Sequence, residues 1–232
     1  YASLGHFYYR RGDYAAAAQQ YGTILTFDDT NETALTGMGT SLMLDGNFEG
    51  AERVFERAIE VRPDAATYSN LGLMYYYLGR HEDAVAAVKS GLELAPTDHL
   101  MWANLGDILT DAGQPVDARA AYERAMELVD MELSINPNDP YILMDVAWLQ
   151  AMLGNEQKAQ SNIEKARGLV PTDPYPSYYE GLIYARYGNN EAAVDALEQA
   201  VADGYSITIL KADPLLAVLH NNPRFKALTN AN

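Results

Sequence analysis

The chain has 232 residues, of which 48% are hydrophobic, so it has enough apolar material for a packed core and is not disordered throughout. Its 16 lysines and arginines stand against 32 aspartates and glutamates, which gives a net charge of −16. This balance argues against DNA, RNA or an anionic membrane surface as a partner, because phosphate groups need a basic face.

Three sets of small residues recur along the chain at nearly constant spacing. The first set is Gly5, Gly39, Gly72, Gly106, Ala147 and Gly181, separated by 34, 33, 34, 41 and 34 residues. Alanines follow with the same separations at Ala17, Ala51, Ala84, Ala118, Ala159 and Ala193. Glycines lie seven residues after each member of the first set, at Gly12, Gly46, Gly79, Gly113, Gly154 and Gly188. These three sets, which we call ladders, keep the same spacing along the chain and predict a repeat protein with six units.

The stretch 65–98 shows what one unit contains. Tyr68, Leu71, Gly72 and Tyr75 are spaced so that they share one face of a first helix. A turn at Gly79 leads into a second helix that carries its own apolar face. Such a pair has too little core to be stable alone, so we expect the units to stack on one another.

The pattern resembles the tetratricopeptide repeat family. The fourth unit shows the family motif best, and its matching residues are Trp102, Leu105, Gly106, Ala118, Tyr122 and Ala125. The resemblance implies an all-α, right-handed superhelical α-solenoid of six helix pairs over residues 1–203. The units are expected at about 1–31, 32–64, 65–98, 99–139, 140–173 and 174–203. The resemblance also implies that the protein is a protein–protein interaction scaffold, whose first helices line a concave groove that binds a peptide or a partner segment.

The fourth unit is seven residues longer than the others, and the extra residues lie in its second helix. Seven residues are nearly two turns, so the apolar face drifts by only ~20° and the helix gains ~10 Å. We therefore expect one long helix over residues 116–135, held by a stripe of Tyr122, Ala125, Val129 and Leu133. Its projecting end is a candidate surface for homo-oligomerisation.

After residue 203 the period stops. Asp213-Pro214 and Asn222-Pro223 are typical of helix starts, so residues 204–232 are expected to form a C-terminal helical cap. This tail resembles the endings of repeat arrays in bacterial multidomain signalling proteins. Because Tyr1 already falls inside the repeat pattern, we expect a segment upstream of it. The alternative function is therefore a self-associating regulatory or sensor domain of a larger bacterial signalling protein, such as a kinase, cyclase or transcription regulator.

Candidate binding residues lie between the core positions of the first helices. They are Asn70, Leu73, Tyr76, Tyr77, Asn104, Asp107, Asp111, Tyr141, Asp145, Trp148 and Tyr178. Tyrosine and tryptophan are frequent binding hot spots. The competing interpretation is that the chain's own tail or long helix covers some of these rings, above all Tyr178 and its neighbours Tyr175 and Tyr179. The side-chain amides of Asn70 and Asn104 can hydrogen-bond to the backbone of an extended peptide; the alternative is a local hydrogen bond within the array.

The expected groove is acidic at its centre, where Asp107, Asp111 and Asp145 lie, and no lysine occurs in any first helix. Members of the family that grip acidic chain ends use lysine and arginine there. The sequence instead favours a basic or amphipathic peptide.

No catalytic residues, metal site or cofactor are predicted, and an enzyme is not expected. The histidines His6, His81, His99 and His220 are scattered, and His81 and His99 are expected to be solvated turn residues. No apolar run approaches the roughly 18 residues that span a bilayer, so direct membrane insertion is not expected. The chain has no cysteine, which suits either side of a membrane. The compartment is unknown; the cytoplasm is the first expectation and the periplasm the alternative.

Overall fold

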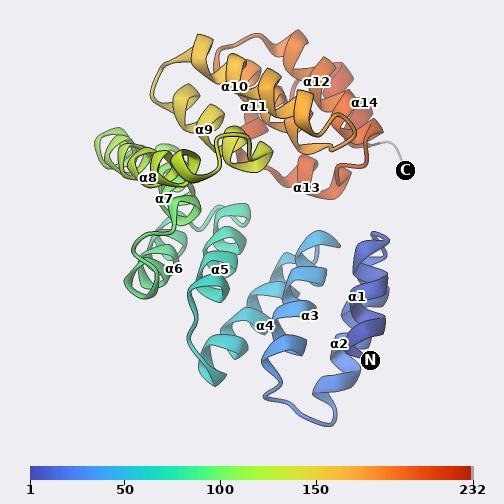
Figure 1. Ribbon diagram of the computed structural model, residues 1–232. Coiled ribbons are helices and arrows are strands. Elements are labelled where there is room, and N and C mark those ends of the chain that lie inside the picture. Colours follow the sequence, from blue (N-terminus) through green and yellow to red (C-terminus); the bar gives the residue numbers. More distant parts are fainter. Residues whose placement is uncertain (231–232) are drawn as a thin grey trace. The chain divides into compact units, whose positions relative to one another are not determined.

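The computed structural model describes residues 1–230, in which the regular elements are helices joined by short turns, without a strand (Figure 1). The chain divides into two compact units, Tyr1–Pro96 and Thr97–Asn232. In both, each odd-numbered helix packs against the helix that follows it. The pairs of the first unit are α1 (Ala2–Arg10) with α2 (Tyr14–Leu25), α3 (Glu32–Leu44) with α4 (Phe48–Val61), and α5 (Ala65–Tyr77) with α6 (His81–Leu94).

The second unit contains three further pairs and a helical tail. The pairs are α7 (His99–Asp111) with α8 (Pro115–Ile135), α9 (Pro140–Met152) with α10 (Glu156–Leu169), and α11 (Tyr175–Arg186) with α12 (Asn190–Ala202). The tail consists of α13 (Ile207–Ala212), the 3₁₀ helix η1 (Pro214–Leu219) and α14 (Pro223–Thr229). The fold is thus the all-α tandem helical array that the sequence predicts.

The glycine ladders have a physical cause in this structure. The six turn glycines all have positive φ, from +71° at Gly79 to +88° at Gly154, a region that residues with a Cβ rarely adopt. The helix glycines lie where two helices touch: a Cβ on Gly106 would come within 2.4 Å of the Tyr122 ring. One ladder therefore makes the turns, and the other lets paired helices approach closely.

Each unit has its own apolar core. In the first unit, Tyr21 of α2 and Phe55 of α4 fill the space between neighbouring helices, and Met74 of α5 is fully buried. In the second unit one part of the core runs from α9 to the tail, where Leu216 and Phe225 are buried, and Met101 of α7 and Tyr122 of α8 are buried as well. Within the described residues, no helix has the combination of length and apolar character needed to cross a membrane.

The tail packs onto the last helix pair, because η1 contacts α11 and α14 contacts α12. Both helix starts predicted in the tail are present: the Asp213 carboxylate accepts the backbone N–H of Leu215, and Asn222 caps α14. Arg224 ties α14 to α12 through the carboxylates of that helix. Its partners, at 3.2, 2.7 and 2.8 Å, are Glu191, Asp195 and Glu198. The last two residues of the expected cap, 231–232, lie outside the described residues.

The long helix of the fourth pair is α8, with 21 residues, whereas the other paired helices have 9 to 14. Tyr122, Ala125 and Val129 of the expected stripe are buried, and Leu133 is partly buried against the core of the second unit. The helix also exposes apolar side chains. These are Val116, Met131 and Ile135.

Candidate functional site

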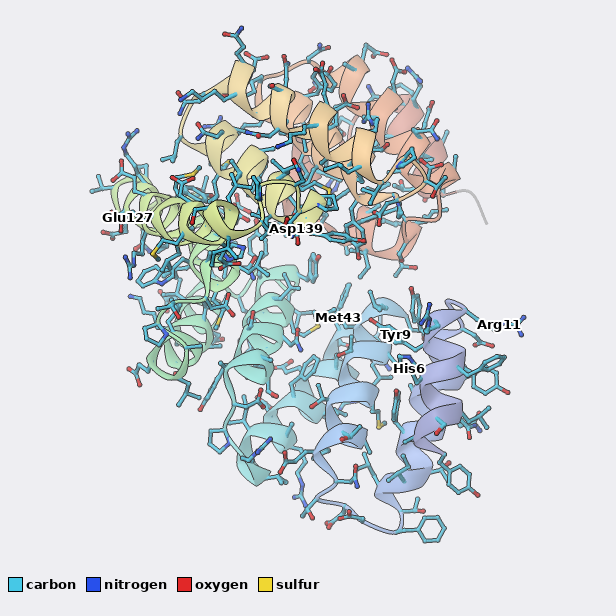
Figure 2. The ribbon with its side chains drawn as sticks, viewed as in Figure 1. His6, Tyr9, Arg11, Met43, Glu127 and Asp139 are labelled. Carbon is cyan, nitrogen blue, oxygen red and sulfur yellow. The ribbon has the colours of Figure 1, made fainter. Side chains whose placement is uncertain are left out.

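The first helices of the second unit frame an open pocket of about 360 Å³, which we call the tyrosine pocket. α7, α9 and α11 all contribute to it. Its lining residues are Leu100, Tyr141, Met144, Asp145, Tyr175 and Tyr179. Asp139, labelled in Figure 2, is the N-cap of α9, and its carboxylate accepts the backbone N–H groups of Ile142 and of Tyr141, which lines the pocket.

Large apolar side chains stand exposed at the mouth of the tyrosine pocket. Tyr141 is 52% exposed, and Tyr175 and Leu100 are each 47% exposed. The Tyr141 hydroxyl donates to the Asp173 carboxylate at 2.9 Å, which fixes the ring in place. Tyr175 lies edge-on to Tyr205, with 5.7 Å between ring centroids. The mouth is therefore built of rings that the fold holds in position and leaves accessible.

Asp145 lies at the floor of the pocket and joins three helices. Its Oδ1 accepts a hydrogen bond from the Tyr179 hydroxyl at 3.1 Å, and its Oδ2 lies 3.2 Å from His99 Nε2. On the other side of the imidazole, Nδ1 lies 2.7 Å from Glu132 Oε1 of α8. Burial and the nearby Asp145 carboxylate raise the pKa of the Tyr179 phenol well above its usual value.

His99 differs from the sequence-based expectation of a solvated turn residue. It is only 7% exposed, because Glu132 and Asp145 enclose the ring from both sides. Burial opposes the charged form, but the hydrogen bonds to Asp145 and Glu132 outweigh it and raise the pKa of the imidazole.

A second polar cluster lies in the interior of the same unit. Asp107 is 8% exposed, and its Oδ1 accepts from the Tyr122 hydroxyl at 2.7 Å and from the Trp148 indole N–H at 3.0 Å. Burial raises the pKa of Asp107 to about 7, although these two hydrogen bonds act in the opposite direction. Trp148 is itself 6% exposed. Both residues were expected to line a groove, and the structure places them in the core because they satisfy one another there.

Tyr178 is covered by the tail, which is the competing interpretation left open by the sequence. Its hydroxyl donates to Asp213 Oδ2 at 2.5 Å, and its ring stacks on Tyr205 with 4.3 Å between centroids. Burial raises the pKa of Asp213 to about 6. The ring therefore holds the tail rather than facing a partner.

The remaining expected residues lie on α5 and α7. In the first unit, Tyr76 is buried, Asn70 and Leu73 are half-buried, and Tyr77 stacks on Phe48 with 5.3 Å between centroids. In the second unit, Asn104 is half-buried and Asp111 is exposed.

The structure thus brings Tyr141 and Asp145 together in one pocket and disperses the other candidates. Sequence reasoning missed Leu100 and the roles of His99 and Glu132. Residues at equal repeat positions in successive first helices do touch, as Asp145 and Tyr179 show, and this rule could have found that pair. Among residues 1–230, no cluster of histidine and acidic side chains is arranged to hold a metal ion.

Comparison with protein families gives two matches, both to models described as tetratricopeptide repeat, over residues 30–97 and 70–140. The chain is also 28% identical over 97 residues to the BBSome complex member BBS4 of Bos taurus. That match covers 41% of this chain and 19% of BBS4, so the chain spans only about a fifth of this relative.

Solved structures with the same fold include the Cut9 and Hcn1 hetero-tetramer of the APC/C, with a TM-score of 0.62 at 17% identity over 94% of this chain and 42% of that chain. TTC0263, a thermophilic TPR protein of Thermus thermophilus, has a TM-score of 0.58 at 18% identity, over 80% and 98% of the two chains. PilF of Pseudomonas aeruginosa has a TM-score of 0.56 at 17% identity, over 90% and 93%. At such identities the likeness shows the fold alone.

Proposed function

The chain is a tetratricopeptide-repeat protein, and from that premise we propose that it is a protein–protein interaction scaffold which binds a partner segment at the tyrosine pocket. The observation that carries the proposal is the exposure of Tyr141, Tyr175 and Leu100 around one open pocket. Gathered apolar exposure of this kind marks interaction sites, and tyrosine buries much area at a low entropic cost.

The test begins with identification of a partner by affinity purification and cross-linking, followed by mapping of its binding segment on a peptide array. The affinity of that segment is then measured for the wild type and for the double variant Tyr141→Ala, Tyr175→Ala. Truncating two hot-spot rings should weaken binding by about tenfold or more. Phe27→Ala is the matched control, because Phe27 is 80% exposed but lies in the first unit, outside the pocket. Equal affinity of all three proteins would move the site elsewhere.

One asparagine in each unit is proposed as a contact to the backbone of a bound peptide, each within its own unit. Asn70 and Asn104 occupy equivalent positions on α5 and α7, and both are half-buried on their helices. A carboxamide can donate to and accept from a peptide backbone whatever the peptide sequence is. Asn104→Ala should therefore weaken the binding of the mapped segment and of peptides with scrambled side chains to the same degree. A loss of affinity for one peptide alone would contradict a backbone contact.

Self-association through α8 is a separate proposal. Its support is the exposure of Val116, Met131 and Ile135, at 81%, 56% and 85%. Light scattering at concentrations on the order of 100 µM, where weak interfaces become populated, should show a mass above 25.6 kDa. Met131→Lys with Ile135→Lys should restore the monomer. A monomeric wild type at that concentration would count against the proposal.

The alternative function, a regulatory or sensor domain of a bacterial signalling protein, is supported by the resemblance of the tail sequence alone. The gene sequence that flanks this chain tests it. A kinase, cyclase or DNA-binding domain encoded in the same reading frame would support it, and flanking sequence without any such domain would reject it.

A further inference from the structure

The floor of the tyrosine pocket carries a net negative charge. Both ring nitrogens of His99 face carboxylate oxygens, at 2.7 and 3.2 Å, so both contacts can be hydrogen bonds only if the imidazole and the two carboxyl groups together hold two protons. With two shared protons, the group formed by His99, Glu132 and Asp145 has a net charge of −1, whichever of the three carries the second proton. The cluster keeps one negative charge, and neither lysine nor arginine is among the residues that line the pocket.

The phenol rings around this floor are oriented by carboxylates. The Tyr141 hydroxyl donates to Asp173, and the Tyr179 hydroxyl donates to Asp145. A phenol that donates to a carboxylate gains electron density in its ring, which makes the face of the ring more negative. Such a face attracts organic cations. The pocket thus presents aromatic walls and an anionic floor to whatever enters it.

We propose that the tyrosine pocket binds the side chain of a lysine or arginine in an extended partner segment. This inference rests on the proposed scaffold function and specifies its ligand. The aliphatic stem of the side chain would lie against Leu100 and Met144, and the cationic head would reach Asp145 between the tyrosine rings. The net charge of −16 favours the approach of a basic segment over longer range.

The test is an NMR titration of the whole ¹⁵N-labelled chain with four blocked peptides, Ac-Gly-Gly-X-Gly-Gly-NH₂, in which X is lysine, arginine, norleucine or glutamate. Lysine and arginine should shift resonances of the pocket residues. Norleucine keeps the stem but lacks the charge, and should bind about tenfold more weakly. Glutamate should give no shifts at the pocket.

Variants at the mouth and the floor test the two parts of the site. Tyr141→Leu keeps the bulk but removes the ring, and should weaken the binding of the lysine peptide by about three- to fivefold. Tyr141→Phe keeps the ring but loses its hydrogen bond to Asp173, and should weaken that binding less. Asp145→Asn should weaken the binding of the lysine peptide by about tenfold. Since Tyr141 is half exposed, its variants give a result even if Asp145→Asn does not fold.

Equal binding of norleucine and lysine, or full retention of lysine binding in Tyr141→Leu, would overturn the cation inference. The scaffold proposal would survive that result, because it depends on the affinity of the natural partner segment for the Tyr141→Ala, Tyr175→Ala double variant. If that variant also binds its partner normally, the scaffold site itself is elsewhere.

Discussion

Replacing Asp107 with asparagine should change how the stability of the second unit depends on pH. The Tyr122 hydroxyl and the Trp148 indole N–H both point to Oδ1 of Asp107, at 2.7 and 3.0 Å. An asparagine keeps an oxygen at that place but cannot ionise. Asp107→Asn therefore preserves the hydrogen bonds of the cluster and removes its titration.

The sign of the effect follows from the direction of the shift. Burial raises the pKa of Asp107 from 3.8 to about 7, so between these values the native state binds a proton that the unfolded state lacks. The stability is fully present below the unfolded pKa and is lost as the pH rises through the folded pKa. From pH 8 to pH 5 the wild type should gain about 3 kcal/mol from this group.

Two other groups act in the same direction. Asp213, with a pKa of about 6, should add about 1 kcal/mol over the same interval. The raised pKa of His99 gives stability that is present below its unfolded value and lost as the pH rises through its folded value. Asp107→Asn should thus keep a weak pH dependence and lose the largest part of it.

The assay is urea unfolding followed by tryptophan fluorescence at pH 5, 6, 7 and 8. Both tryptophans of the chain, Trp102 and Trp148, lie in the second unit, so the signal reports on that unit alone. Asp130→Asn is the control, since it is the same chemical replacement at an exposed position of α8. The reasoning is refuted if Asp107→Asn and Asp130→Asn show the same pH dependence.

Three further changes have expected outcomes in the same unfolding assay or a related one. Gly106→Ala should destabilise the second unit by about 1–3 kcal/mol, since the added Cβ would lie 2.4 Å from the Tyr122 ring. Gly168→Ala is the control: its Cβ would have no heavy atom within 4 Å, so it should be neutral or stabilise by up to about 1 kcal/mol. Tyr178→Phe removes one hydrogen-bond donor from the buried Asp213, and should lower the free energy of unfolding by about 1–3 kcal/mol. It should also speed hydrogen exchange in residues 207–229, and unchanged exchange would contradict the role of Tyr178 in anchoring the tail. Arg224→Ala should lower the stability of the second unit only slightly, and the loss should disappear in 1 M salt, because the ion pairs of Arg224 are exposed. A loss that does not depend on salt would point to packing instead.

The periodic features of the fold could be predicted because they repeat a single physical requirement. Each turn needs a residue that tolerates positive φ, and Gly79 and Gly154 meet that need in different repeats. Each helix pair needs a small residue where backbones approach, as Gly106 does against Tyr122. A requirement that recurs at a fixed spacing is visible in one sequence without any alignment.

The burial of single polar side chains could not be predicted from one repeat alone, because it depends on which residues meet when equal positions of successive first helices are compared. Asp107 and Trp148 occupy the same position in successive first helices, one residue after Gly106 and Ala147. The spacing within each repeat places both on the expected groove, and together they form a buried hydrogen-bonded pair. A contact between neighbouring repeats is not visible within either repeat taken by itself.

The floor of the tyrosine pocket depends on α8, the long helix of the fourth repeat, where the regular spacing is interrupted. Glu132 lies on α8 beyond the length of the other second helices, and it reaches His99 at the start of α7. The corresponding position in the other repeats holds no histidine; it is occupied by Glu32, Ala65, Pro140 and Pro174. The seven extra residues were expected to provide a projecting surface, but they also supply the carboxylate that holds His99 against Asp145. A deletion of seven residues that restores the common length should therefore remove Glu132 from the cluster and alter the pocket, even though no lining residue would be changed.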